Sequence, residues 1–299
     1  MGITSSNFNR IIDISLIPDN SKAAVPAEMR KPKTITCPRH GRKPSIEITG
    51  EFWADMTLPS FNITVKNLYL DLQKEQYAKI EVNCGYEGNT VPIKGTIFSI
   101  YPESPGPDGK TVIQCVLGNM QDWLESTVNL NFESGAGLPE ILDAVKTQLK
   151  ASQVFMGVTA KTLRLTEPFM HNGSAREAIS RLIKIFEEKR LALFMRDSTL
   201  CAVCATKGDF LGTHVLLFIS APPQMNTGDE RGTYYATIQA PWMPKLRIGD
   251  LLEIPSRVYM HNMKLVGSGK TQRIQVTTIK FHFSTTGGAN SMTVQGFIS

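Results

Sequence analysis

The feature that most constrains the fold is the alternation of apolar and polar residues between turn signals in the last part of the chain. The stretch from Pro244 to His282 opens with Pro-x-Leu-x-x-Gly-Asp-x-Leu-Glu-Ile, in which a Gly249-Asp250 turn leads into a short strand at Leu251–Ile254. Glycine supplies the positive φ, and aspartate the side-chain capping, that turns between strands require. The alternating run that follows predicts antiparallel strands with one buried face.

Strict alternation in that run also predicts which side chains share a face, because successive residues of a strand point to opposite sides. The two predicted faces are Ile274, Val276, Thr278, Lys280 and His282 on one side, and Gln275, Thr277, Ile279, Phe281 and Phe283 on the other.

The same signal recurs in the first half of the chain. One run places Ile80, Val82 and Cys84 on one face, so Cys84 is expected to be a small core hydrophobe. The proline- and glycine-rich stretch Pro102–Gly109 is expected to be a projecting hairpin loop and not the interior of a strand. Four strands within about sixty residues make an antiparallel meander, and closing it into a barrel would remove its edges.

The middle of the chain changes to a helical period. Leu138–Leu149 carries apolar residues at helical spacing after a glycine-rich entry. A second helix is expected over Ser174–Lys189, where the Ser174 hydroxyl can cap the helix, with Glu177 three residues on. A β-hairpin over residues 192–205 follows. The buried stripe of the second helix is predicted to be Ala178, Leu182, Ile185 and Phe186.

Together these elements resemble the baseplate hub and late-control family of phage tails. Proline, leucine, Gly249-Asp250, a strand, an aromatic-containing strand and a histidine-containing strand follow one another as in the last barrel of that family. A Gly-Tyr-Glu-Gly turn at 85–88, a Lys-Gly-Thr-Ile-Phe strand at 94–98, a long loop and an Ile-Gln-Cys strand at 113–115 are similar to its first barrel. Helix, Asn-Gly-Ser, helix and hairpin resemble the small α/β domain between the barrels. The resemblance covers roughly residues 45–299.

The resemblance implies a mainly β protein with a small α/β insert, in which two tail-tube-like β-barrel domains flank a helix-hairpin domain. A chain of 299 residues is long enough for two or three domains. The expected divisions are 1–44, an N-terminal strand and extended arm; 45–132, the first β-barrel domain; 133–207, the small α/β domain; and 208–299, the second β-barrel domain, completed by N-terminal strands.

The function implied by the resemblance is structural, that of a baseplate or tail-tip hub in a phage or phage-like injection particle. Three copies would form a ring connecting the tail tube protein to the central spike protein. A tape-measure protein would occupy the lumen, and DNA would pass through it without specific binding. The expected location is the virion tail, with synthesis in the cytoplasm of the bacterial host before assembly.

Charge and composition agree with this role. The chain has 32 Lys and Arg against 27 Asp and Glu, a net charge of +5, whereas a strongly basic lumen would hold DNA by counterion release. The densest basic region, Arg30–Lys43, is interrupted by prolines, which favours a solvated connector over a nucleic-acid contact. No apolar run approaches the ~20 residues of a membrane helix, so no membrane insertion is expected. Five cysteines, an odd number, argue against a secreted disulfide scaffold.

Motifs for catalysis and metal binding are incomplete. Residues 267–271, Gly-Ser-Gly-Lys-Thr, lack the earlier glycine of a phosphate-binding loop, since Lys264 stands there, and a hairpin turn explains them better. Cys201 and Cys204 have zinc-like spacing, but residues three apart in a strand point to opposite faces. The only candidate partner is the stretch Cys37-Pro-Arg-His40. We therefore expect no enzymatic activity and no catalytic, cofactor-binding or metal-binding residues.

A second class of function stays open on sequence grounds. The same β scaffold could serve as a tail-associated cell-wall hydrolase or as a host-receptor-binding module. A hydrolase needs paired carboxylates or a metal site, and the acidic residues of this chain are scattered. The structural hub is therefore the preferred interpretation.

Overall fold

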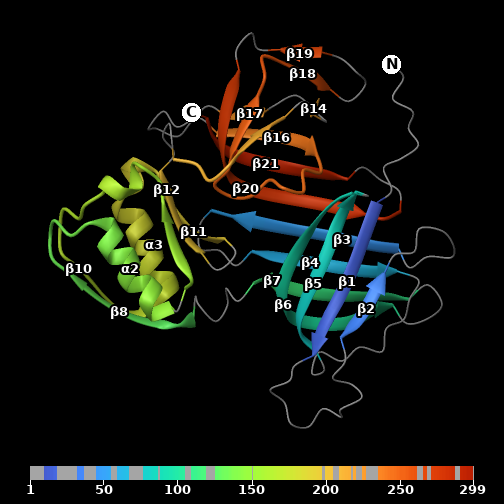
Figure 1. Ribbon diagram of the computed structural model, residues 1–299, viewed down its shortest axis with the longest axis horizontal. Helices are drawn as coiled ribbons and strands as arrows, with labels where there is room; N and C mark the ends of the chain where they lie inside the picture. The colour runs from blue at the N-terminus through green and yellow to red at the C-terminus, as the bar shows by residue number, and fades with distance from the viewer. Residues whose placement is uncertain are drawn as a thin grey trace.

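The computed structural model describes residues 10–18, 32–36, 45–54, 59–66, 77–86, 88–104, 109–118, 125–149, 151–196, 199–204, 209–216, 218–219, 224–226, 235–260, 265–267, 271–286 and 290–298. The protein is mainly β, as the sequence predicts. The two α-helices among the described residues, α2 (Leu138–Leu149) and α3 (Ala175–Ile185), both lie in the middle of the chain. Figure 1 shows them packed together at one side of the molecule, with strands from both ends of the chain side by side at the other.

Thirteen strands form one large sheet, in the order β15-β16-β21-β20-β3-β4-β7-β6-β5-β1-β2, with β17 pairing with β20 and β13 pairing with β17. We call it the large sheet. Its strands are β1 (Arg10–Pro18), β2 (Lys33–Thr36), β3 (Ser45–Trp53), β4 (Ser60–Lys66), β5 (Tyr77–Tyr86), β6 (Asn89–Ser104), β7 (Lys110–Leu117), β13 (Thr213–Val215), β15 (Gln224–Asn226), β16 (Tyr235–Pro241), β17 (Leu251–Ile254), β20 (Gln272–Ser284) and β21 (Ser291–Ile298).

The two ends of the chain meet where β20 pairs with β3. This antiparallel register runs from Thr278 opposite Trp53 to Ser284 opposite Glu47, so the first and last parts of the chain share one sheet. Among the described strands no pairing closes either part into a barrel, and the two-barrel arrangement stays a prediction. The completion of the second barrel by N-terminal strands also stays a prediction. Strand β1 pairs with β5 of the first part. Within the predicted arm, β2 forms a strand that pairs with β1.

A bulge in β20 overturns the two faces that strict alternation predicts. The register with β21 shifts between Val276 and Thr278, which leaves one extra residue, Thr277, in β20. After the shift, Ile279 and Phe281 point to the side already occupied by Val276, and all three belong to one core. The carbonyl of Thr277 accepts a 2.7 Å hydrogen bond from the backbone N–H of Ala54, which satisfies the bulge.

The expected hairpin loop at Pro102–Gly109 is shorter than predicted. Strand β6 continues to Ser104, with Pro102 opposite Thr111 of β7. A register shift between Pro102 and Ser104 accommodates the proline, because a bulge tolerates a residue without a backbone N–H. Residues 105–108 lie outside the part of the chain that the structure describes.

Residues 125–204, which we call the middle segment, contain both helices and two small sheets. Strand β8 pairs with β10, and β12 pairs with β11 and β9. The elements are β8 (Thr127–Phe132), β9 (Gln153–Met156), β10 (Phe169–Ser174), β11 (Leu191–Arg196), β12 (Thr199–Cys204) and the 3₁₀ turns η3 (Ala160–Thr162) and η4 (Glu187–Lys189). A separate small sheet near the C-terminal part of the chain contains β14 (Phe218–Ile219), β18 (Arg257–Met260) and β19 (Leu265–Gly267).

Both predicted helices form, but the second is shorter than predicted: α3 ends at Ile185, and Glu187–Lys189 form the 3₁₀ turn η4 after Phe186. Helix α2 has the predicted bounds, and the hydroxyl of Ser174 accepts a hydrogen bond from the Glu177 N–H at the start of α3. The prediction of Ile185 as a core residue is wrong, since it is 44% exposed, and Ile179 is fully buried instead. At 100° per residue the stripe is centred between Ala178 and Ile179, which turns Ile185 toward solvent.

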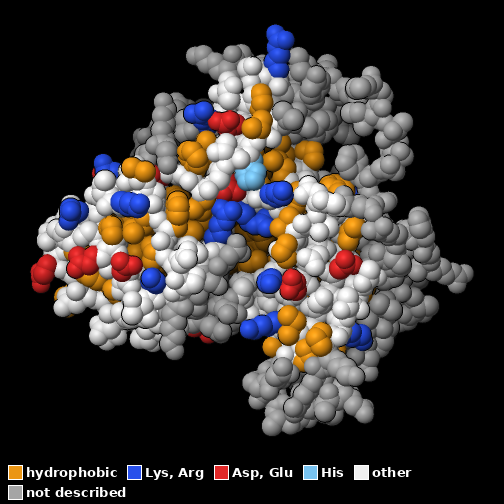
Figure 2. All heavy atoms as spheres, viewed as in Figure 1, with side chains coloured by type: hydrophobic (Ala, Val, Ile, Leu, Met, Phe, Trp, Pro, Cys, Tyr) orange, Lys and Arg blue, Asp and Glu red, His pale blue; other side chains and the backbone are white. Residues whose placement is uncertain are grey.

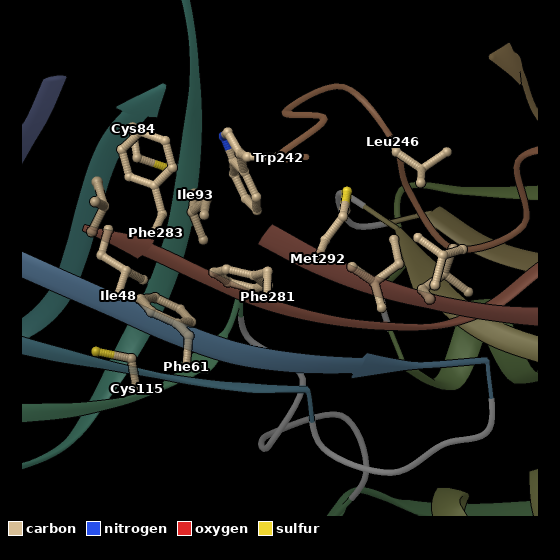
Figure 3. Packing of buried hydrophobic residues seen from close by; sticks show 14 of the residues in the cluster. Ile48, Phe61, Cys84, Ile93, Cys115, Trp242, Leu246, Phe281, Phe283 and Met292 are labelled. Carbon is tan, nitrogen blue, oxygen red and sulfur yellow. The ribbon is translucent and has the colours of Figure 1, made fainter. Parts of the chain in front are cut away.

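Buried apolar residues form two cores. The larger joins both parts of the large sheet and includes Phe61 of β4 and Phe283 of β20, both shown in Figure 3. The smaller lies among α2, α3 and the sheets of the middle segment. Strand β12 serves both cores, because Cys201 belongs to the larger one and Cys204 to the smaller one. The middle segment is thereby packed against the large sheet through one face of its own hairpin.

Candidate functional site at two buried aspartates

Two aspartates are buried where the middle segment meets the large sheet. Asp250 is 0% exposed and Asp209 is 1% exposed. An ionised carboxylate is costly to bury unless it is paired and hydrogen-bonded. The partners of each aspartate therefore identify the contacts that this region of the fold requires.

Asp250 binds side chains from two distant elements. Its Oδ1 accepts a 2.8 Å hydrogen bond from Nη1 of Arg196, at the end of β11. Its Oδ2 lies 3.0 Å from Nε2 of His214 in β13 and accepts a 2.9 Å hydrogen bond from the backbone N–H of Arg247. The carboxylate thus closes its own turn and holds both the hairpin of the middle segment and β13.

The Gly249-Asp250 turn requires glycine at its first position for two reasons. Its φ is +83°, a conformation that L side chains rarely adopt. A Cβ at this position would also lie 2.4 Å from Cζ of Phe194 in β11 and 2.9 Å from Cδ1 of Leu211. The glycine therefore permits both the turn and the close approach of β11, which brings Arg196 to Asp250.

Asp209, the second buried aspartate, also connects separate elements of the chain. Its carboxylate accepts backbone hydrogen bonds from Thr159 at 2.9 Å, from Ala160 at 3.2 Å and from Cys204 at 3.0 Å. These donors lie at the start of η3 and at the end of β12, so the side chain fixes two pieces of the middle segment. The backbone carbonyl of Asp209 accepts a 2.8 Å hydrogen bond from Nε2 of Gln275 in β20. Asp209 therefore also connects the middle segment to the large sheet.

A cluster of aromatic rings lies where the two parts of the large sheet meet. Trp242 lies with its ring centroid 5.0 Å from that of Phe281 and 5.6 Å from that of Phe283. Phe281 is also 5.2 Å from Phe52, and Phe283 is 5.7 Å from Tyr86. Figure 3 shows Trp242, Phe281 and Phe283 together between strands of the first and last parts of the chain. Tilted and edge-on pairs of this kind add stability beyond the area that they bury.

A carboxylate on β3 connects the same two parts. Glu47 lies 2.8 Å from Nζ of Lys66 on β4 and 2.7 Å from Nε2 of His282 on β20. The hydrogen bond from Lys66 holds the pKa of Glu47 below its ordinary value, against the effect of burial, and His282 acts in the same direction as Lys66. The carboxylate is therefore held ionised between strands of both parts.

The cysteines take the structural role that the sequence predicts for Cys84. All four described cysteines are buried and free of disulfides. Burial raises the pKa of Cys84 and of Cys204 to about 12, and it raises the pKa of Cys115 as well. Cys201 and Cys204 face different cores, which confirms that they point to opposite sides of their strand. Cys37 and His40 lie outside the described residues.

The described histidines are separated as well. His171 lies 3.0 Å from the carbonyl of Ser174, while His214 faces Asp250 and His282 faces Glu47. The pair of His214 and Asp250 is the nearest approach to a catalytic arrangement. Within the described ranges, no hydroxyl or thiol is hydrogen-bonded to the second ring nitrogen of His214, as a nucleophile would be. The arrangement orients and neutralises a buried carboxylate.

No three His, Cys, Asp or Glu side chains among the described residues come together as a metal site would require. No described helix is long and apolar enough to cross a membrane.

Sequence reasoning found the Gly249-Asp250 turn but not the other members of this site. Arg196 and His214 are 54 and 36 residues away from Asp250 in sequence, and no local pattern marks them. Asp209 carried a usable signal, because it also follows a glycine, Gly208, between predicted strands.

Comparison with known proteins adds evidence on the fold. No protein-family model matches the sequence. Curated protein sequences give no match either. Solved structures do match, among them the following two tail proteins. The 43 kDa tail protein of prophage MuSo2 from Shewanella oneidensis has a TM-score of 0.56 and 12% identity, over 95% of this chain and 97% of that chain. A tail protein from Neisseria meningitidis MC58 has a TM-score of 0.56 and 10% identity, over 97% of both chains.

A third match comes from a secretion system. The E. coli c3393 protein, a component of the type VI secretion system with structural similarity to the T4 bacteriophage tail proteins gp27 and gp5, has a TM-score of 0.56 and 12% identity, over 86% of this chain and 74% of that chain. Likeness at these identities is a likeness of fold. The chain has the fold of phage tail proteins and of this secretion-system component, as its resemblance to the baseplate hub and late-control family predicts.

Proposed function

We propose that this chain is a structural hub at the tip of a phage tail or of a phage-like injection particle. The observation that carries the proposal is the likeness to two tail proteins over nearly the whole length of each chain. A match of this extent includes the middle segment as well as both parts of the large sheet. The proposal therefore concerns the whole chain rather than one domain of it.

In the proposed assembly, three copies form a ring between the tail tube protein and the central spike protein. If each copy supplies two tube-like domains, the ring offers an approximately sixfold surface to the tube and a threefold one to the spike. A closed ring also uses exposed sheet edges without allowing open fibres. Strands β2 and β15, which end the pairing path among the described strands, are the proposed sources of these contacts.

The contacts at Asp209, Asp250 and Glu47 support a structural role for the chain. Each connects elements from different regions of the chain through buried or half-buried charge. The proposed role needs no cofactor and no enzymatic activity. A net charge of +5 suits a lumen that lets DNA or a tape-measure protein pass without binding it tightly. Synthesis would take place in the host cytoplasm before assembly into the virion.

Native mass spectrometry of the chain, expressed with and without a spike protein from the same particle, tests the proposal. The expected result is a complex of three copies of this chain with the spike trimer. A complex with one copy for each spike, or none at all, would contradict it. Incubation with cell-wall sacculi tests the alternative of a hydrolase, since release of soluble fragments by the purified chain would favour that function.

A further inference from the structure

A cleft of about 690 Å³ lies between the two parts of the large sheet and the end of the hairpin in the middle segment. Its walls come from β5 and β6 on one side and from residues 242–248 on the other, with β20 behind. Apolar side chains make up most of this lining, among them Ile80, Ile93, Trp242 and Phe281. Figure 2 shows basic side chains and a histidine gathered around a hollow at the centre of this face.

Trp242 leaves a hydrogen-bond donor unused in this cleft. The residue is only 7% exposed, and its Nε1–H is buried without a hydrogen-bond partner among the described residues. In Figure 3 the indole nitrogen lies at the end of the ring away from Phe281, between the strand that carries Ile93 and the segment that carries Leu246. All four of these residues line the cleft. Buried indole N–H groups usually have an acceptor, and a ligand in the cleft can supply one if the Trp242 side chain turns its N–H toward it.

The charge of the cleft indicates what kind of ligand would bring it. The described lining residues include four cationic side chains, Lys79, Lys94, Arg196 and Arg247, and one anionic side chain, Glu81. Asp250 pairs with Arg196 and is therefore counted as a second anion. The four cations then outnumber the anions by two. Arg196 uses Nη1 for Asp250, and its side chain is 31% exposed, so its other N–H groups can reach a ligand.

We propose that this cleft binds an extended segment of a partner protein, in which carboxylate side chains stand beside an apolar one. The apolar side chain would lie against Ile80, Ile93 and Phe281, and the Trp242 side chain would turn so that its N–H donates to a backbone carbonyl of the segment. The carboxylates would face Lys79, Lys94 and Arg196. This assignment does not depend on the hub role, because it concerns binding by the isolated chain.

A peptide-binding experiment on the full chain tests the assignment. The probe is the synthetic peptide acetyl-Gly-Ser-Asp-Leu-Asp-Leu-Ser-Gly-amide with a rhodamine label, followed by fluorescence anisotropy. The expected result is saturable binding that weakens about tenfold in the double variant Lys79→Glu/Lys94→Glu. The matched control is Lys161→Glu/Lys184→Glu, which makes the same charge change at exposed lysines of the middle segment and should leave binding unchanged.

The variant Trp242→Phe tests the hydrogen bond separately, since it keeps an aromatic ring and removes the N–H. It should weaken binding about fivefold. If Trp242→Phe does not fold, as judged by circular dichroism, the proposal is tested by Lys79→Glu/Lys94→Glu against its control. Absence of binding up to about 1 mM peptide, equal loss in both double variants, or equal binding of a peptide with Asn in place of Asp would overturn the proposal. Sedimentation velocity that shows self-association lost on Lys79→Glu would assign the cleft to a second copy and would also overturn it.

Discussion

The guanidinium of Arg196 and the carboxylate of Asp250 meet at 2.8 Å, although 54 residues separate them in sequence and Asp250 has no exposed surface. Arg196 ends a strand of the middle segment, and Asp250 occupies the turn before β17 of the large sheet. A charge-assisted hydrogen bond of this kind has strict geometric requirements. The pair therefore fixes how the hairpin sits on the large sheet.

Replacement of Asp250 by asparagine should destabilise the protein strongly. The change leaves Arg196 without its counter-charge and leaves His214 facing a neutral amide. We expect the free energy of unfolding to fall by about 3 kcal/mol, measured by urea denaturation. The control is Lys110→Met, which removes an open ion pair to Glu103 at 3.7 Å and should cost less than about 1 kcal/mol. Equal losses in the two variants would contradict a special role for Asp250.

Gly249→Ala separates backbone strain from steric contact. Both Gly249 and Gly88 have positive φ, +83° and +79°, but a Cβ at Gly88 would meet nothing within 4 Å. Gly88→Ala should therefore show strain alone, about 1 kcal/mol, whereas Gly249→Ala adds the clash with Phe194 and should lose about 3 kcal/mol. Thermal and urea unfolding of the two variants give the difference directly. A loss no larger for Gly249→Ala than for Gly88→Ala would mean that β11 can move away freely.

Gly249 and Asp250 also show how much of the site the sequence alone could predict. Turn chemistry located Gly249 and Asp250, because that chemistry is local. The partners of Asp250 could not be predicted, since burial and long-range pairing select them. The bulge at Thr277 escaped prediction for a related reason: alternation assumes an unbroken register, and the interruption is set by the neighbouring strand β21. Helix α2, with its continuous amphipathic pattern, was predicted to the residue.

The pKa of Glu47 predicts how stability depends on acidity. Because this pKa is lower in the folded protein than its ordinary value of 4.5, ionised Glu47 stabilises the fold above that pH. The contribution is lost as the pH falls through the lower, folded pKa. The difference in unfolding free energy between the wild type and Glu47→Gln should be constant near neutrality and shrink below about pH 4.5.

A Lys66→Met variant serves as the matched test of the cause. Lys66 contributes most to lowering the pKa of Glu47, so its loss should bring the folded pKa closer to 4.5 and make the acid-dependent loss of stability smaller. Urea denaturation between neutrality and strong acid measures both effects. A wild-type advantage over Glu47→Gln that stays unchanged down to strong acid would show that the interaction of Glu47 with Lys66 and His282 does not stabilise the fold.

The buried thiols should be inert in the native protein. Thiolates are the reactive form, and a pKa near 12 leaves Cys84 and Cys204 protonated at neutral pH, within a core that reagents do not reach. In a Cys37→Ser variant, Ellman's reagent should therefore detect no thiol before unfolding and four thiols in urea. Rapid reaction of any thiol under native conditions would contradict the assignment of these cysteines to closed cores.

We propose that three copies of this chain form the ring between tail tube and spike. Cryo-electron microscopy of the assembled particle measures this directly, by locating the chain and counting its copies. The expected result is three copies around the tail axis at the junction of tube and spike, with the large sheets of neighbouring copies edge to edge. Six copies around the axis, or a position on peripheral fibres, would contradict it.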